Sequence, residues 1–330
     1  KPFSNINFRF DEFKSLYLTG LASFLIVTFA FIIPLSVDID NQLAINSESK
    51  INNSKTDFEK VLSGESIDDK ETVDEGLDLS NILEDVFKFD ELPEDTVRLS
   101  ASTIEQLFKD TNYSLSEVRR TKKVKPIRLS LLPNEMKSIE NSGKRKNLFI
   151  KIILPLVLEE NNRIIIDRKK LFTILNKNKN SKDEIKWLNQ KFKQYGVVNK
   201  DLATLKVRMD IIPVSLAIAQ AAKETGWGTS RFAIEGNALF GQWTWSGEGI
   251  KPAGADTNAT YKVMKFNVLK ASVRAYQRNL NTHSSYKKFR FIRAQLRDDN
   301  KKLDSLKLAE CLDNYAQTGT EYTKVLKQII

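Results

Sequence analysis

A glutamate near the end of a predicted apolar helix is the first residue whose type and position suit catalysis. Glu224 lies in the stretch AKETGWGTS, two residues before Gly226 and three before Trp227. Glycine adopts the left-handed conformation that commonly closes helices, so we expect the helix to end at Gly226. A carboxylate in the last turn faces the negative end of the helix dipole, and burial beside an indole disfavours its charge further. Both effects would raise the pKa of Glu224 and favour a protonated acid near neutral pH.

A protonated carboxyl group of this kind suits the cleavage of a glycosidic bond. The leaving oxygen must receive a proton as the bond breaks, and a carboxylic acid of raised pKa can supply it. Taken alone, however, a glutamate at such a position is more often a solvated surface residue.

The aromatic residues that follow Glu224 favour the catalytic interpretation. Three of the four tryptophans lie between residues 227 and 245, and a tyrosine follows soon after. Aromatic rings offer flat apolar surfaces on which the C–H faces of sugars can pack. We expect Trp243 or Trp245 to line a groove and Phe240 to lie in the core, although an aromatic core between helix and hairpin is an alternative for each ring. The candidate substrate-binding aromatics are Trp227, Trp243, Trp245 and Tyr261.

The composition excludes several other kinds of site. The chain of 330 residues has one cysteine, Cys311, and one histidine, His283. A single cysteine cannot form a disulfide framework, and no histidine–cysteine cluster is available for zinc. No G-x-S-x-G sequence accompanies His283 to support a serine-hydrolase triad. We therefore expect carboxylate chemistry that needs neither a metal nor an organic cofactor.

Charge is distributed unevenly along the chain. The net charge is +10, yet residues 38–95 contain 18 Asp or Glu and 5 Lys, a net of −13. Residues 96–330 therefore carry +22, since residues 1–37 contribute +1. A basic body of this kind suits an anionic partner such as nucleic acid, a membrane surface or an acidic polymer.

An uncharged apolar stretch near the N-terminus helps to choose among these partners. Residues 15–37 are long enough to span about 30 Å of hydrocarbon as a helix. Basic residues precede this stretch and acidic residues follow it, which predicts a cytoplasmic segment at residues 1–14 and an external body. A cleaved signal peptide and a buried core helix are the alternatives. The expected protein is anchored once in the inner membrane, with its catalytic domain in the periplasm. In a bacterium the acidic polymer outside the membrane is the cell wall, so we expect no nucleic acid as the partner.

Composition divides the remaining chain into three predicted parts. Residues 38–95 are rich in acidic and polar residues, with few aromatics, and are predicted to be a flexible linker in which LSNILEDVF forms at most a transient helix. Residues 96–200 have the pattern of an all-helical lead-in, where LFIKIILPLVLEEN is a buried helix too short to cross a membrane. Residues 201–330 are predicted to form the catalytic domain.

This last part contains the elements that must position Glu224. The stretch IPVSLAIAQAAKETG is rich in helix formers, with Pro213 in the first turn. Residues 239–266 lose the helical period and combine short strand patterns with turn residues, which predicts a small β-hairpin lobe. Amphipathic helices follow. The predicted fold class is α+β, mostly α.

The stretch PVSLAIAQAAKETGWGTSRFAIEGNALFGQWTWSGEGI resembles the Bax-type branch of the bacterial glucosaminidase superfamily, within glycoside hydrolase family 73. The motifs P-x-S-x-x-I-A-Q-A-x-x-E-[ST]-x-W-G and N-x-L-F-G carry the likeness, which extends over residues 120–330. The resemblance implies a lysozyme-like fold and hydrolysis of the β-1,4 bond between N-acetylglucosamine and N-acetylmuramic acid in peptidoglycan. It also implies that Glu224 is the general acid.

The identity of a second catalytic group stays open. Hydrolysis needs a partner that acts as nucleophile or activates water. In relatives a later acid in the β-lobe has been given this role; Asp256 fits the interval, Glu248 also lies in the lobe, and the substrate's own N-acetyl group is a third candidate. Tyr315 matches a family position that faces the site. Gln220, one turn before the general acid, is expected either to orient it or to pack within the helix.

Two other functions also stay open. A lytic transglycosylase uses a single acid at a comparable helix end and leaves an anhydro product. A non-catalytic glycan-binding or scaffold protein would keep a groove without turnover. The presence of Glu224 argues against the non-catalytic protein, whereas spacing alone does not separate the transglycosylase from the endo-β-N-acetylglucosaminidase, which is the function we expect.

Overall fold

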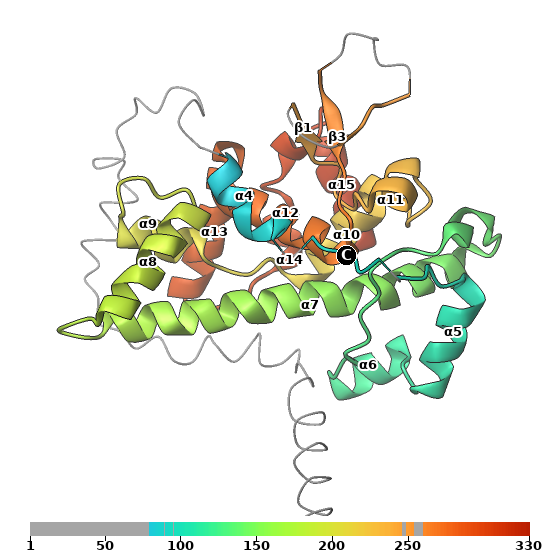
Figure 1. The fold of residues 1–330 in the computed structure, drawn as a ribbon, viewed down its shortest axis with the longest axis horizontal. Helices are drawn as coiled ribbons and strands as arrows, with labels where there is room; N and C mark the ends of the chain where they lie inside the picture. Colours follow the sequence, from blue (N-terminus) through green and yellow to red (C-terminus); the bar gives the residue numbers. More distant parts are fainter. Residues whose placement is uncertain (1–78, 89, 95, 246–248, 254–259) are drawn as a thin grey trace, which may run out of the picture. The chain divides into compact units, whose positions relative to one another are not determined.

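Helices make up most of the structure, a computed structural model that describes residues 79–330 except 89, 95, 246–248 and 254–259 (Figure 1). The predicted membrane anchor and residues 38–78 of the predicted linker lie outside the described residues. Within the described part, no helix combines the length and hydropathy that crossing a bilayer requires.

The described helices fall into two series along the chain, one before residue 210 and one after it. The first comprises α4 (Leu79–Phe87), α5 (Ala101–Asp110), α6 (Leu115–Thr121), η2 (Asn134–Ser138), α7 (Ser142–Leu175), α8 (Lys182–Gln194) and α9 (Leu202–Arg208). The second comprises α10 (Val214–Thr225), α11 (Arg231–Gly236), α12 (Leu269–Thr282), η3 (Ser284–Tyr286), α13 (Lys287–Asp298), α14 (Ser305–Ala309), η4 (Asp313–Tyr315) and α15 (Thr320–Ile329).

A three-stranded antiparallel sheet interrupts the second series between α11 and α12. Its strands are β1 (Trp243–Thr244), β2 (Gly249–Ile250) and β3 (Lys262–Met264), in the order β1-β3-β2. Trp243 pairs with Val263, and Gly249 pairs with Met264. The predicted α+β class, mostly α with a small β-lobe, is confirmed.

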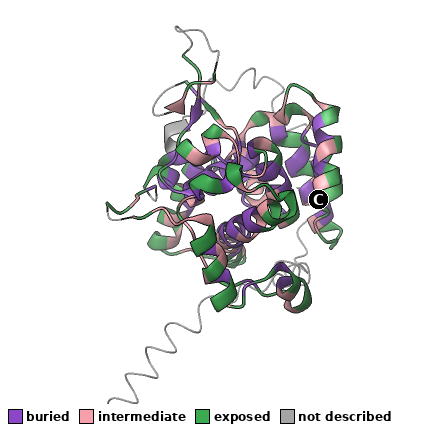
Figure 2. Ribbon diagram, turned by 90° about the vertical axis from the view of Figure 1, so that its right-hand side faces the viewer, coloured by how far each residue is buried: buried purple, intermediate pink, exposed green. Residues whose placement is uncertain are grey.

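Helix α7 connects two hydrophobic cores. Its N-terminal half contributes to the larger core together with α10, α12 and α15, where residues such as Phe149 and Leu216 are fully buried. Its C-terminal half packs with α8 and α9 in a second core that includes Ile174 and Phe192. Figure 1 shows α8 and α9 beside one end of α7 and α5 and α6 near the other. Buried residues gather in the middle of the helical body, and exposed residues cover its outside (Figure 2).

Pro155 lies inside α7, whereas the sequence predicts a separate short helix over residues 148–161. Proline has no N–H, so the carbonyl oxygen of Lys151, four residues earlier, lacks its usual helical donor. The hydroxyl of Tyr113 donates a hydrogen bond to this oxygen over 3.1 Å. Because a side chain from another segment satisfies the carbonyl, the helix continues through the proline and reaches a total length of 34 residues.

The prediction of a flexible linker that continues to residue 95 is wrong for residues 79–87, which form α4 and pack against α8 and α12. Asp85 forms an ion pair with the buried guanidinium of Arg278 at 3.0 Å. Asp90 then accepts hydrogen bonds from two backbone amides just before α12. Helix α4 packs in this way because its apolar residues share one face of the helix. The buried acidic residues in and after it have an arginine or backbone amides as partners. The buried apolar residues of this face are Ile82, Leu83 and Val86.

Helix α10 begins and ends where the sequence predicts. Pro213 occupies the N-cap, and Gly226 closes the helix in the left-handed conformation with φ of 56°. The helix packs against α7, α14 and α15. Its last turn is thereby held within the larger core, and that turn carries Glu224.

Candidate active site

Glu224 has the electrostatic character that the sequence predicts. Its side chain is partly buried in the last turn of α10. Burial raises the pKa of the carboxyl group above its ordinary value, while the nearby Tyr322 hydroxyl and the charge of Lys223 lower it less. The net effect favours the protonated form, which is the form that can donate a proton.

Phenol groups from four different elements lie near enough to this carboxyl group for its charge to raise their pKa values. Burial raises the pKa of each phenol, to about 12 for Tyr286, and the negative charge of Glu224 raises it further. The rings of Tyr315 and Tyr322 stack at 5.5 Å, and Tyr286 lies 5.9 Å from Tyr315. The environment is therefore polar but neutral at physiological pH. The four residues are Tyr276 on α12, Tyr286 on η3, Tyr315 on η4 and Tyr322 on α15.

Gln220 joins two of these phenols. Its side chain is fully buried one turn before Glu224. The Tyr276 hydroxyl donates to Gln220 Oε1 over 2.7 Å, and Gln220 Nε2 donates to the Tyr322 oxygen over 3.1 Å. Both hydrogen bonds of the Gln220 side chain therefore go to phenols of the helices packed around the acid.

The segment before β1 brings a glycine against the carboxyl group. A Cβ atom on Gly241 would lie 3.1 Å from Glu224 Oε2, and Gly241 has φ of 61°. Tyr315 donates a hydrogen bond from its hydroxyl to the carbonyl of Phe240 over 2.8 Å. The buried Phe240 ring stacks on Tyr276 at 3.8 Å, as expected for a core residue. The predicted position of Tyr315 near the acid thus includes a role in holding this segment.

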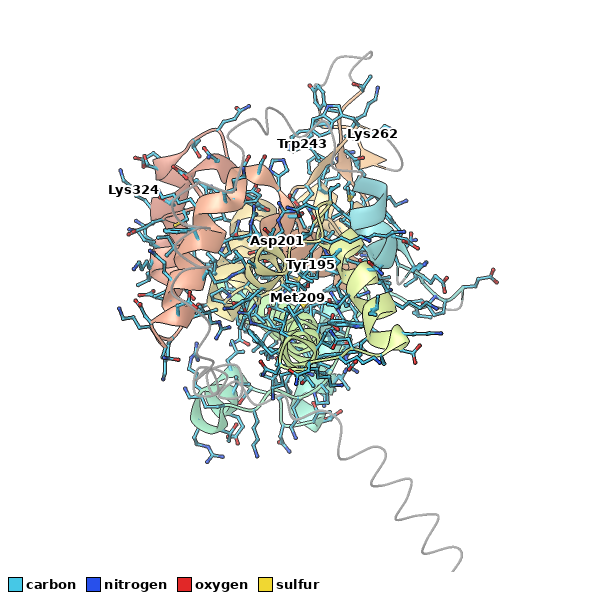
Figure 3. The ribbon with its side chains drawn as sticks, turned by 90° about the vertical axis from the view of Figure 1, so that its left-hand side faces the viewer. Tyr195, Asp201, Met209, Trp243, Lys262 and Lys324 are labelled. Atoms are coloured by element: carbon cyan, nitrogen blue, oxygen red, sulfur yellow. The ribbon has the colours of Figure 1, made fainter. Side chains whose placement is uncertain are left out.

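Exposed aromatic side chains gather on the small sheet. Trp243 and Tyr261 are 49% and 38% exposed, with ring centroids 5.4 Å apart at an angle of 67°. Trp245, just after β1, is 69% exposed. Figure 3 shows Trp243 and Lys262 together on the sheet, away from Tyr195 and Met209 in the helical body. Such exposed rings beside a lysine can contact both the apolar faces and the anionic groups of a glycan.

Comparison with known proteins assigns the family. Residues 199–330 match the glucosaminidase family, described as mannosyl-glycoprotein endo-beta-N-acetylglucosaminidase. Protein bax of Escherichia coli (strain K12) is 34% identical over 206 residues, which cover 60% of this chain and 72% of that protein. The chain belongs to the Bax-type glucosaminidase-domain proteins. No solved structure matches it significantly.

Trp227 of this Bax-type protein packs against the lead-in helix. Its ring meets Phe149 edge-on at 6.1 Å, and Lys146 Nζ lies 4.9 Å from the ring centroid, both on α7. Gly226, Trp227 and Gly228 have consecutive positive φ angles of 56°, 62° and 82°, so the chain makes a tight left-handed turn. These contacts fix the turn after Glu224, and a contact of Trp227 with substrate stays a prediction.

Four further residues were singled out from the sequence of this Bax-type protein, namely Asp256, Glu248, His283 and Cys311. Asp256 and Glu248 lie outside the described residues. His283 is the C-cap of α12, and Cys311 is buried. No group of three or more His, Cys, Asp or Glu suited to a metal ion occurs in the described part of the chain.

Sequence reasoning missed Tyr276, Tyr286, Tyr322 and Gly241 as neighbours of the acid. Gly241 lies within N-x-L-F-G, one of the motifs that carry the resemblance, so a signal was present for it. Tyr276 and Tyr322 lie within the wider resemblance over residues 120–330, but no local signal links them or Tyr286 to α10.

Proposed function

We propose that this chain is an endo-β-N-acetylglucosaminidase that cleaves the β-1,4 bond between N-acetylglucosamine and N-acetylmuramic acid in peptidoglycan. The observation that supports this most is the partly buried Glu224, whose carboxyl group has a raised pKa inside the region that matches the glucosaminidase family. The helical body with a small β-lobe is consistent with a lysozyme-like fold.

Glu224 acts as the general acid in this proposal. Its protonated carboxyl group donates the proton to the glycosidic oxygen as the bond to the anomeric carbon breaks. The electron pair of that bond goes to the leaving oxygen, and positive charge develops on the sugar. Asp256, Glu248 or the substrate's N-acetyl group then stabilises the charge or activates the attacking water.

The exposed rings on the sheet are proposed to bind the glycan strand. Trp243, Trp245 and Tyr261 offer stacking surfaces to sugar rings, and Lys262 extends from the same sheet. Peptidoglycan peptides carry free carboxylates, which the net charge of +22 over residues 96–330 attracts. We also propose that residues 15–37 anchor the chain in the inner membrane, with the catalytic part in the periplasm.

The test compares the full wild-type chain with Glu224→Gln on purified peptidoglycan. We expect reducible N-acetylglucosamine ends from the wild type, detected by mass spectrometry before and after borohydride reduction. Loss of the general acid should lower product formation by about 10² to 10⁴-fold. Glu235→Gln is the matched control, because Glu235 lies in the next helix with its side chain 58% exposed, and should retain wild-type activity.

Each other outcome rejects the proposal in a defined way. Anhydro ends would identify a lytic transglycosylase. Glycan binding without any product, from a folded wild-type chain, would identify a binding protein.

A further inference from the structure

We propose that the segment around α4 holds the β-lobe in position, and that Asp90 is a positioning residue for the glycan-binding surface of that lobe. The segment comprises residues 79–88 and 90–92, and we call it the strap. This inference rests on the part of the proposed function in which the exposed rings of the lobe bind the glycan. It assigns a role to a segment outside the residues that match the glucosaminidase family.

Asp90 completes the start of helix α12 from a distant part of the sequence. Its carboxylate accepts hydrogen bonds from the backbone N–H groups of Asn267 over 2.8 Å and of Val268 over 3.0 Å. Val268 is the N-cap of α12, and its apolar side chain cannot accept a hydrogen bond there. A helix start leaves backbone donors unpaired and favours negative charge, so a carboxylate fits this position. Asp90 is 7% exposed, which shields both hydrogen bonds from water.

Asn267 connects this point to the segment beside Glu224. Its side-chain amide donates to the Asp90 carbonyl oxygen over 2.8 Å. Its own carbonyl oxygen accepts from the side-chain amide of the buried Asn237 over 3.0 Å. Asn237 begins the motif N-x-L-F-G, which ends at Gly241 against the Glu224 carboxyl group. Hydrogen bonds and a short stretch of backbone therefore join the strap to the neighbour of the proposed acid.

The end of strand β3 packs on the strap through apolar side chains. Ile82 and Val86 share one hydrophobic core with Met264 and Phe266, and Leu92 packs against that core. Met264 is the last residue of β3, and Phe266 lies between this strand and α12. Displacement of the strap would expose both side chains to water, so their burial favours the docked arrangement.

Charged contacts hold the α4 part of the strap on the helical body. The two carboxylate oxygens of Asp85 accept from the Arg278 guanidinium over 3.0 Å and 3.2 Å, and Arg274 donates to the Asp85 backbone carbonyl over 3.1 Å. Both arginines lie on α12 and are buried, and Arg274 also pairs with Glu160 of α7 at 2.7 Å. The strap therefore contacts α12 at its start and further along its length, which gives the lobe a support anchored in the helical body.

The lobe is too small to fix its own position. Its described strands have two or three residues each, and a sheet of this size depends on packing against other elements. In the central strand β3, Val263 pairs with Trp243, whose ring lies 5.4 Å from that of Tyr261. A shift of β3 would therefore displace the rings proposed to bind the glycan relative to Glu224.

The first experiment measures glycan affinity without turnover. The full chain carries Glu224→Gln, which removes the proposed acid and leaves the glycan intact, and its Kd for purified peptidoglycan is measured by co-sedimentation. Addition of Asp90→Ala should raise this Kd about 3- to 10-fold, because the lobe loses the hydrogen bonds at the start of α12. Asp90→Asn should retain most of the affinity, because its amide oxygen can still accept a hydrogen bond from a backbone amide.

Asp201→Ala in the same background is the matched control. Asp201 also accepts hydrogen bonds from two backbone amides at a helix start, those of Ala203 and Thr204. It caps α9, however, which packs in the second core and not on the lobe. Both alanine variants should lower the midpoint of urea unfolding, but only Asp90→Ala should weaken binding. An equal rise of Kd in the two variants overturns the positioning role.

Hydrogen exchange of backbone amides tests the strap without any glycan. Asp90→Ala should speed exchange at residues 262–268, whereas Asp201→Ala should speed it at the start of α9. Unchanged protection of residues 262–268 in Asp90→Ala overturns the inference, and so does faster exchange there with an unchanged Kd. A wild-type chain that binds peptidoglycan without cleaving it would reject the proposed hydrolase alone, because neither measurement needs turnover.

Discussion

Two carboxyl groups near opposite ends of helix α10 have pKa values that are shifted in opposite directions. Asp210 lies before the helix and is 2% exposed, and Glu224 lies in its last turn. Burial alone would raise the pKa of both groups. Three arginines reverse this effect at Asp210 and hold its pKa well below the ordinary value. These partners are Arg297 at 3.0 Å and Arg168 and Arg293 at 3.9 Å.

The difference separates a carboxylate that is held charged from a carboxyl group that is suited to donate a proton. Asp210 stays charged and joins α7, α13 and the start of α10 through its ion pairs. Glu224 forms no ion pair among the described residues and has neutral phenols around it. A carboxyl group that is left uncompensated in this way retains its proton more readily, which suits acid catalysis and adds little to stability.

Removing the charge of Asp210 should have the largest effect on stability. Asp210→Asn leaves buried guanidinium groups without their counterion, and breaking such a pair typically costs about 3–5 kcal/mol. Urea denaturation followed by circular dichroism measures this loss. Asp299→Asn is the control, since Asp299 and its partner Lys301 are both exposed, and should change stability by less than about 0.5 kcal/mol. A similar small effect at both positions would contradict the structural role of Asp210.

A side chain at position 241 should disturb the surroundings of Glu224. Gly241→Ala places an L-residue at positive φ, which costs about 1–2 kcal/mol, and brings a methyl group against Glu224. Gly319→Ala is the control for a positive φ without the contact, because Gly319 has φ of 55° but open space at its Cβ position. Its ψ of −119° lies outside the left-handed helical region, so we expect Gly319→Ala to lose at least as much stability in thermal unfolding. Only Gly241→Ala should also lose hydrolytic activity. Equal activity in the two variants would show that the contact with Glu224 is unimportant.

The smallest expected effect is a change in the pH dependence of stability. The raised pKa of folded Glu224 means that the native state binds more protons than the unfolded state above about pH 4.5, so this group lowers stability as pH rises through its folded pKa. Glu224→Gln should remove that decline. Asp210 acts oppositely, because its contribution is present above about pH 3.8 and is lost as pH falls towards its lowered pKa. Unfolding measured between pH 3 and pH 8 would contradict this if Glu224→Gln followed the wild-type slope throughout.

Local signals in the sequence predicted the start and end of α10, the β-lobe and the acidic character of Glu224. They did so because proline and glycine caps, strand alternation and the helix dipole depend on neighbouring residues. The phenols around Glu224 come from four elements between residues 269 and 329, so only tertiary packing brings them together. The orientation of Trp227 towards Phe149 likewise depends on α7, which is distant in the sequence.

Two errors in the predicted fold have the same origin. The sequence favours a short helix around Pro155, but Tyr113 supplies the missing donor from a separate segment. The acidic composition of residues 38–95 favours a solvated linker that includes residues 79–87, but buried arginines such as Arg278 compensate the charge of Asp85. In both cases the deciding partner lies elsewhere in the chain, where local composition carries no information about it.

The match to the glucosaminidase family begins at residue 199, but the folded body does not divide there. Helix α7, which is 34 residues and about 50 Å long, lies before this boundary and contributes to the larger core. Phe149, Ile153 and Val157 share one hydrophobic core with Leu216 and Tyr276. A fragment that starts at residue 199 would expose the apolar surface that these α7 residues cover. The helix that precedes the glucosaminidase-family region is therefore part of the same folding unit, and the chain must be synthesised through both before the larger core can close.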